Sequence, residues 1–296
     1  MSSKIITPNS TEKPTLGYES ARRVKVMRGP SLSLLGALKD LRVLADYRDL
    51  LYTLTVHRIR VRYKQSALGI FWAVLQPLSL MLIYTMVFSL FARMPSNGAP
   101  YSIFIYTSLL PWSAFATALS TATNSLVSHT NLVTKVYFPR EILPLTYVLA
   151  SVVDFLIASI LMAALMIYYR MPLTVKVLYA VPLMIVMALF TTAVAFISAA
   201  TQVRFRDVGV AIPLLLQLWM FATPVVYPLD SVPLRLRGLY ELNPMVGIIE
   251  NFRRVVLFGL SPDAHSLFIS VLVTAVLLPL SYAYFKRVDM TIADVI

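Results

Sequence analysis

The 296-residue chain contains no cysteine, which excludes disulfides, thiol nucleophiles and thiolate metal sites. Its three histidines, His57, His129 and His265, lie far apart and lack the helical spacing of a metal site. None of the long apolar runs carries two acids, or an acid together with a histidine, as a membrane hydrolase or proton relay normally requires. The sequence therefore predicts no catalytic residues and no metal site in this chain.

Glycine is scarce as well, with nine glycines and no Gly-Lys pair. A P-loop needs a glycine-rich turn whose amides cradle phosphate, followed by Lys-Ser or Lys-Thr. The chain cannot hydrolyse ATP by that route, and we expect it to hold no cofactor of its own.

Charged residues are also few. They make up 14% of the chain, against about 25% in soluble domains, while hydrophobic residues make up 58%. This composition predicts an integral membrane protein with one membrane-embedded domain. The net charge is +12, but 13 of the 26 lysines and arginines lie within the first 66 residues. A basic arm next to a long apolar run indicates contact with anionic lipid headgroups rather than with nucleic acid.

Two regions are predicted ahead of the membrane domain. Residues 1–30 are polar and basic with three prolines, and we expect a disordered extension. Residues 31–66 carry apolar side chains three and four positions apart, at Leu44, Tyr47, Leu51 and Leu54. This pattern is typical of an amphipathic helix in the cytoplasmic interface, although a soluble helix packed on a partner protein would share it.

Six apolar stretches predict an all-α membrane domain over residues 67–288, followed by a cytoplasmic tail over residues 289–296. The predicted spans cover residues 69–91, 102–123, 142–169, 177–200, 208–226 and 267–285. A collar of four cations, Arg58, Arg60, Arg62 and Lys64, precedes the first span and favours a cytoplasmic start. Of the 26 basic residues, 19 then fall on the N-terminal side of the membrane and seven on the other, so we expect both termini in the cytoplasm.

The segment between the fifth and sixth spans is too charged to cross a bilayer. We expect two short interfacial or re-entrant helices there, hinged at Asn243-Pro244 and ended by Gly259. In the second helix, Ile249 and Phe252 belong to a predicted apolar face. The opposite, polar face is predicted to carry Glu250, Arg253 and Arg254.

Asp154 is the one acid well inside a predicted span. A carboxylate at the centre of a membrane helix costs about 2.5 to 3.5 kcal/mol on insertion scales, so it should face a partner or water. Two interpretations stay open: Asp154 lines a polar path, or it hydrogen-bonds to a neighbouring helix.

Aromatic residues are frequent near the span ends, as in an interfacial belt. A minority facing inward would be able to stack on sugar rings. Together with Asp154, the candidates for a translocation path are Trp72, Tyr106, Trp112, Phe115, Trp219 and Tyr227.

Five short sequence motifs carry a more specific signal of the protein family. They are RVRYKQSALGIFWAVLQPL from residue 60, KVYFPREILPL from 135, VRFRDV from 203, TPVVYPLDSVP from 223 and LNPM from 242. In this order, and in register with six spans, they resemble the permeases of type-2 ABC transporters that export polysaccharides. The resemblance covers about residues 40–290.

The resemblance implies a homodimeric permease in the bacterial cytoplasmic (inner) membrane, with two copies of a separate P-loop ABC ATPase that bind ATP and Mg²⁺. Its substrate would be a lipid-linked polysaccharide in contact with membrane lipids. We favour O-antigen or a related cell-surface polysaccharide, with capsular polysaccharide or teichoic acid as the alternative.

Residue roles follow from the resemblance. ATPase coupling or the cytoplasmic gate is implied for Leu44, Tyr47, Arg48, Lys135, Phe138, Pro139, Arg140, Glu141, Arg204, Arg206 and Asp207. The external gate is implied for Leu239, Tyr240, Asn243, Pro244, Ile249, Phe252 and Arg253. We expect Arg140 and Glu141 at the cytoplasmic gate, unless this pair simply anchors the chain at the membrane interface.

Two other classes of membrane protein agree less well with the sequence. A membrane-embedded glycan-modifying enzyme would need converging acids or histidines, and Asp154 stands alone. A secondary transporter would need ionisable residues in several spans and internal repeats, neither of which the sequence contains.

Overall fold

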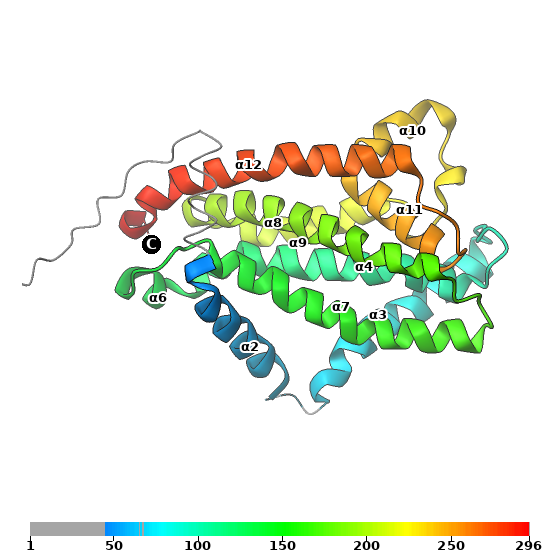
Figure 1. The fold of residues 1–296 in the computed structure, drawn as a ribbon, viewed down its shortest axis with the longest axis horizontal. Helices are drawn as coiled ribbons and strands as arrows, with labels where there is room; N and C mark the ends of the chain where they lie inside the picture. The colour runs from blue at the N-terminus through cyan, green and yellow to red at the C-terminus, as the bar shows by residue number, and fades with distance from the viewer. Residues whose placement is uncertain (1–44, 65, 67, 296) are drawn as a thin grey trace, which may run out of the picture.

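The computed structural model describes residues 45–295 except residues 65 and 67. Every regular element among them is a helix, so the all-α prediction is confirmed (Figure 1). The predicted extension over residues 1–30 and the following residues up to Leu44 lie outside the described part.

Five helices are long and apolar enough to cross a bilayer, and they match five of the six predicted spans. These cover Gly69–Ser89, Tyr101–Thr123, Ile142–Tyr168, Val175–Arg204 and Ala264–Met290. The corresponding elements are η1 (Gly69–Phe71) with α3 (Trp72–Tyr84) and the π-helix η2 (Thr85–Phe91), α4 (Tyr101–Thr123), α7 (Ile142–Tyr168), η3 (Val175–Tyr179) with α8 (Ala180–Arg204), and α12 (Ala264–Val295).

The remaining predicted span is shorter than expected. Helix α9 covers Val208–Phe221, which is 14 residues or about 21 Å, less than the roughly 30 Å of a hydrocarbon core. Residues 222–226 are not helical. Pro224 lacks the N–H that a helix interior requires, and Val225 and Val226 turn into the core instead.

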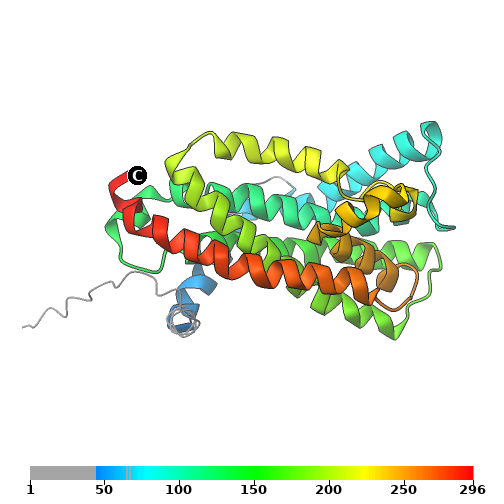
Figure 2. The same ribbon diagram turned by 90° about the horizontal axis from the view of Figure 1, so that it is seen from above.

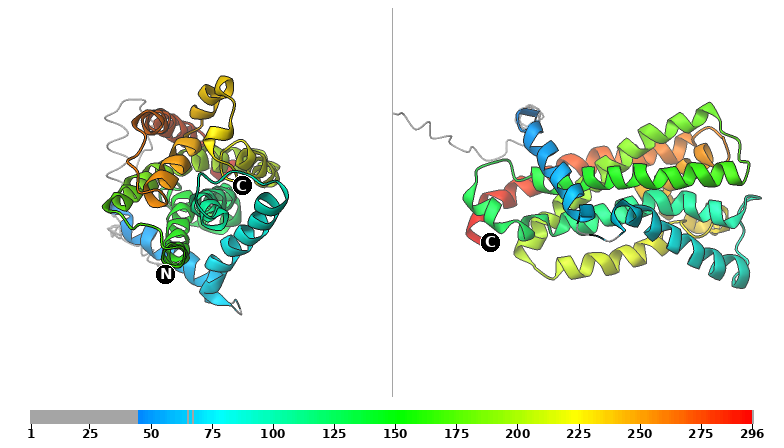
Figure 3. Two further views of the ribbon diagram at one scale, coloured as in Figure 1. Left: turned by 90° about the vertical axis from the view of Figure 1, so that its right-hand side faces the viewer. Right: turned by 90° about the horizontal axis from the view of Figure 1, so that it is seen from below.

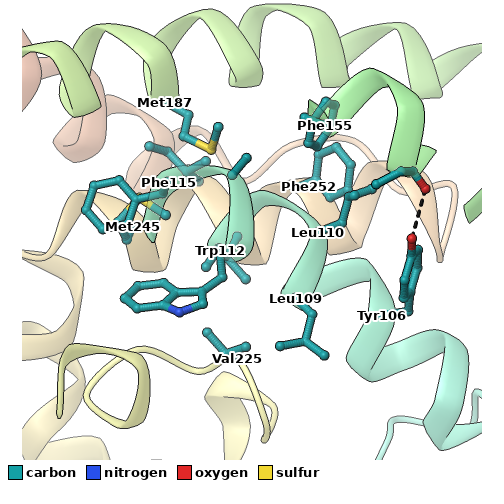
Figure 4. Packing of buried hydrophobic residues seen from close by; sticks show 14 of the residues in the cluster. Tyr106, Leu109, Leu110, Trp112, Phe115, Phe155, Met187, Val225, Met245 and Phe252 are labelled. Carbon is teal, nitrogen blue, oxygen red and sulfur yellow. Dashed lines mark hydrogen bonds between the residues drawn. The ribbon is translucent and has the colours of Figure 1, made fainter. Parts of the chain in front are cut away.

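Helix α4 forms the centre of the bundle. Seen end-on in Figure 3, it is surrounded by its neighbours, and it packs against α3, α7, α8 and α9. In its most apolar window 78% of the residues are buried, against 17% in the first span, so α4 carries the core and α3 lies at the edge. Figure 4 shows part of this core, including Leu109, Phe115 and Phe252.

Helix α2 (Arg48–Lys64) lies at the end of the bundle that also holds α5 (Ser125–Ser128), α6 (Thr130–Lys135) and the C-terminal end of α12 (Figure 1). One side of this segment, with Tyr47, Leu51 and Leu54, packs against a buried cluster that includes Phe138. Its other side carries exposed Arg48. The helix is therefore buried on one side only, and its location in the membrane interface stays a prediction.

At the opposite end lie η4 (Leu229–Ser231) and the two predicted short helices, α10 (Leu234–Glu241) and α11 (Pro244–Val256). The Asn243 side chain caps α11 by accepting a hydrogen bond from the Met245 amide at 3.1 Å. Gly259, at φ 61°, follows the helix.

Asp263 precedes α12, and its carboxylate accepts a hydrogen bond from the Ser266 amide at 2.9 Å. That bond stabilises the charged form and lowers the pKa of Asp263.

Gly247 sets how closely α11 approaches α12. A Cβ atom at this position would lie 2.2 Å from the Ser270 hydroxyl and 2.6 Å from the Ser266 carbonyl oxygen. Overpacking of this kind costs roughly 1–3 kcal/mol, so we expect Gly247→Ala to lower the thermal unfolding midpoint in detergent. Gly238→Ala is the control, because nothing lies within 4 Å of its added methyl group. Equal midpoints for both variants would contradict this account of the α11–α12 contact.

Candidate functional site

The start of α7 is joined to the end of α12 by two ion pairs. Glu141 is only 2% exposed, and its carboxylate accepts hydrogen bonds from Lys286 Nζ at 2.7 and 2.9 Å. Beside it, Arg140 Nη1 donates to the Asp289 carbonyl oxygen at 2.7 Å and to the Asp289 carboxylate at 3.1 Å. A buried carboxylate needs such a partner, so the two helices are held together at this end.

The segment before these pairs is exposed to solvent. Lys135, Val136 and Tyr137 are exposed, Phe138 is buried in the cluster below them, and Pro139 is half-buried. Phe138 thus anchors a loop whose outer face is both basic and apolar.

The turn between α8 and α9 lies at the same end of the bundle (Figure 2). Arg204, Phe205, Arg206 and Asp207 are all exposed. Gln202 fixes the turn from below: its Nε2 donates to Asn124 Oδ1 at 3.1 Å, and its Oε1 accepts a hydrogen bond from the Gly209 amide.

The described residues predicted to couple to an ATPase therefore come together. Tyr47 and Arg48, the loop before α7 and the α8–α9 turn all lie at this one end of the bundle, although they come from distant parts of the sequence. Leu44 lies outside the described residues.

Asp154 is paired with α2. Its carboxylate accepts hydrogen bonds from Arg62 Nη1 and from the Tyr63 hydroxyl. Burial, together with the hydrogen bond to Asp154, raises the pKa of Tyr63, so its phenol stays protonated and remains a donor. Of the two interpretations of Asp154, a hydrogen bond to a neighbouring helix is present in the structure.

Asp154 lies beside the start of the first span. It lines a cavity together with Ala73 and Gln76, which belong to the first turns of α3. The middle of α7 (Ile142–Tyr168) is therefore level with the beginning of α3.

Three of the predicted path residues belong to the core. Tyr106 and Phe115 are 0% exposed and Trp112 is 4% exposed. The Tyr106 hydroxyl donates to the Ala158 carbonyl oxygen at 2.9 Å, and the Phe115 ring lies 5.2 Å from that of Trp219 (Figure 4). Rings enclosed by other helices cannot stack on a sugar, so we assign these three to packing.

The other path candidates are less buried. Trp72 is 49% exposed, while Trp219 and Tyr227 are half-buried. Among the described residues, no group of three or more His, Asp or Glu side chains is arranged to hold a metal ion.

Arg253 corrects the predicted polar face of α11, because its side chain is completely buried. Its Nε and Nη2 donate to Ser108 Oγ at 3.1 and 2.6 Å, and Nη2 also donates to the Pro224 carbonyl oxygen at 2.7 Å. Nη1 donates to Glu250 at 2.7 Å, and the guanidinium lies 4.2 Å from the centre of the Phe104 ring. Arg253 therefore ties α11 to α4 and to the segment after α9.

The other residues predicted for the external gate lie near Arg253 or elsewhere at the same end of the bundle. Asn243 Nδ2 donates to Thr223 Oγ1 at 3.0 Å, and the hydroxyls of Tyr227 and Tyr240 lie 3.2 Å apart. Pro244, Ile249 and Phe252 are buried, whereas Leu239 is exposed. Ser108 was missed by sequence reasoning, since a serine in an apolar helix 145 positions from Arg253 carries no local signal.

Replacing Arg253 tests this network. Removing one partner of a buried charged network typically costs about 3–5 kcal/mol, so we expect Arg253→Gln to lower the free energy of unfolding by about that amount. Arg254→Gln is the matched control. Arg254 is half-buried, and its one hydrogen bond, to the Ser261 carbonyl oxygen, is long at 3.3 Å, so its loss should cost less than about 1 kcal/mol. Denaturant unfolding in detergent measures both, and similar losses would contradict the special role of Arg253.

Comparison with known proteins adds to this geometry. Residues 49–258 match the family model described as ABC-2 type transporter. The chain is similar to the O-antigen export system permease protein RfbA of Myxococcus xanthus, with 34% identity over 244 residues, which cover 81% of this chain and 93% of that protein. Two proteins of the same name from Klebsiella pneumoniae are 27% identical over 212 residues, covering 71% of this chain and 81% of each of them. The chain therefore belongs to the ABC-2 type transporter family.

Proposed function

We propose that the chain is the permease subunit of an ATP-driven exporter of lipid-linked O-antigen or a related cell-surface polysaccharide in the bacterial cytoplasmic membrane. The observation that carries this proposal is the similarity to O-antigen export permeases over most of both chains. Export of capsular polysaccharide or teichoic acid is the second candidate, because the five sequence motifs resemble permeases of those exporters as well.

ATP hydrolysis is assigned to a separate ABC ATPase, bound in two copies. The absence of a Gly-Lys pair from the sequence supports this assignment. So does the end of the bundle that gathers α2, α6 and the α8–α9 turn, where basic and apolar side chains are exposed together. We place this end in the cytoplasm because, in the topology predicted from the sequence, its side of the membrane carries 19 of the 26 basic residues.

A homodimer is supported by the side of the bundle that carries α3 and α9 (Figure 2). Few residues of the first span are buried within the chain, and α9 exposes Val210, Leu214 and Leu218. Gln217 is also exposed on α9. An amide facing lipid is unfavourable, so a second copy or an aqueous conduit suits this surface better than hydrocarbon does.

Force from the ATPase would reach the far end through packed helices. The Glu141–Lys286 and Arg140–Asp289 pairs join the loop before α7 to α12. The opposite end of α12 packs on α11, and Arg253 joins α11 to α4. Movement of the cytoplasmic loops would in this way be passed to the external helices.

Depleting the protein from the bacterium that produces it tests the transport function. We expect the surface polysaccharide to disappear and its lipid-linked form to accumulate inside, with recovery when the chain is expressed again. Mass spectrometry of the accumulated glycan distinguishes O-antigen from capsular polysaccharide or teichoic acid. Unchanged surface polysaccharide without internal accumulation would refute the proposal.

The Glu141–Lys286 pair allows a sharper test of coupling. We expect Glu141→Lys to reduce export by about tenfold, a typical loss of coupling free energy, because two ammonium groups would then face each other. Lys286→Glu in the same chain restores an ion pair and should recover most of the export. Arg287→Glu reverses the charge at an adjacent exposed position and should have little effect. Failure of the double variant to recover would count against the pair as a coupling element.

A further inference from the structure

A polar cleft lies between the C-terminal half of α2 and helices α3, α4 and α7. It consists of two small adjoining cavities that share Arg62, Thr117, Ser151 and Asp154. The centres of water molecules have about 40 Å³ of free space in the larger cavity and about 10 Å³ in the smaller, so the larger one has room for more than one water molecule.

The cleft contains two arginines, Arg58 and Arg62, but one carboxylate, Asp154, so one positive charge is left without a negative partner in the cleft. Asp154 is engaged by Arg62 and Tyr63. Arg58 lines the same cavity, and its guanidinium lies 4.5 Å from the centre of the Tyr147 ring. Stacking occupies one face of the guanidinium and leaves its in-plane N–H donors free to bind an anion.

Further hydrogen-bond donors line the cavity that adjoins Arg62. The side chains of Gln76, Ser113 and Thr117 line it, and within the described part of the chain none of the three is hydrogen-bonded by its side chain. Two cations and several neutral donors suit the multiple acceptor oxygens of a phosphate group.

The two ends of the cleft differ in polarity. The cavity that holds Arg58 also contains Thr117, Thr121 and Ser151. The other continues along apolar residues, namely Ala73, Pro77, Leu110, Ala114, Phe155 and Ala158. A molecule with a phosphate at one end and a hydrocarbon chain at the other would fit both ends, whereas inorganic phosphate would use only the first.

The position of the cleft beside the first span agrees with such a ligand. Ala73 and Gln76 belong to the first turns of that span. The cleft therefore adjoins the end of the span at which lipid headgroups would lie.

We propose that this cleft binds the phosphate group of a membrane lipid, held by Arg58 and Arg62 with Thr117 and Gln76 as additional donors. The lipid chain runs along Pro77 and Ala114 towards the bilayer. The site does not depend on which polysaccharide the transporter carries.

Binding of phosphatidylglycerol to the full chain, purified in a neutral detergent and followed by native mass spectrometry, tests the proposal. We expect Arg58→Gln to weaken binding by about tenfold or more, as expected for the loss of a charge-assisted hydrogen bond. Arg60→Gln is the matched control: it removes the same charge two positions away, on the exposed side of α2, and binding should stay near the wild-type value. Thr117→Val keeps the shape of the side chain and should weaken binding several-fold, and it provides a second test that leaves the Arg58–Tyr147 contact intact.

Competition with inorganic phosphate shows whether the cleft binds a lipid phosphate or a free phosphate. We expect it to displace phosphatidylglycerol only weakly, because it cannot use the apolar end. Displacement by inorganic phosphate at concentrations similar to those of the lipid would overturn the lipid assignment. Equal lipid binding by the Arg58→Gln and Arg60→Gln variants would overturn the phosphate site itself. Neither measurement involves the ATPase or a glycan, so its failure is distinct from a failure of the transport function.

Discussion

The hydrogen-bonded guanidinium of Arg253 is the interaction on which the end of the molecule that carries α10 and α11 depends. A fully buried cation is tolerated only when its hydrogen bonds are satisfied, and Ser108, Pro224 and Glu250 supply the acceptors. These acceptors come from α4, from the segment after α9 and from α11 itself. Three segments that are distant in the sequence are thereby fixed around one side chain. The same segments also share a buried apolar cluster, so the hydrogen bonds of Arg253 and this apolar packing together hold α11 inside the bundle.

Polar contacts also define the other end of the molecule. The bilayer gives little hydrophobic driving force for one helix to pack on another, so small residues and polar contacts determine the arrangement. Here two ion pairs join α7 to α12, and one joins α2 to α7. Between the two ends, α4 is packed mainly through apolar and aromatic side chains. The molecule is thus fixed by charges at its ends and by close packing in its middle.

The sequence was sufficient for features that depend on local pattern. Apolar runs predicted six spans, and five of them are confirmed at full length, because helix length follows directly from residue number. Asn243, Pro244 and Gly259 predicted the boundaries of α11 through capping chemistry. The sequence could not place Arg253 or Asp154, since their partners are 145 and 92 positions away. Helical periodicity assigned Arg253 to a solvent-facing side, and only the tertiary packing shows it enclosed. The length of α9 was overestimated because hydropathy continues through Pro224, where the helix cannot.

The pairing of Asp154 determines where α2 is attached to the bundle. The Asp154 carboxylate binds Arg62 and Tyr63, which lie in the last turn of α2. From Ile142 to Asp154 there are 12 residues of helix, or about 18 Å, so α2 is tied to the middle of α7 as well as to the buried cluster at the start of α7. A displacement of α2 would therefore act on α7 at two levels about 18 Å apart, and would tilt that helix rather than slide it.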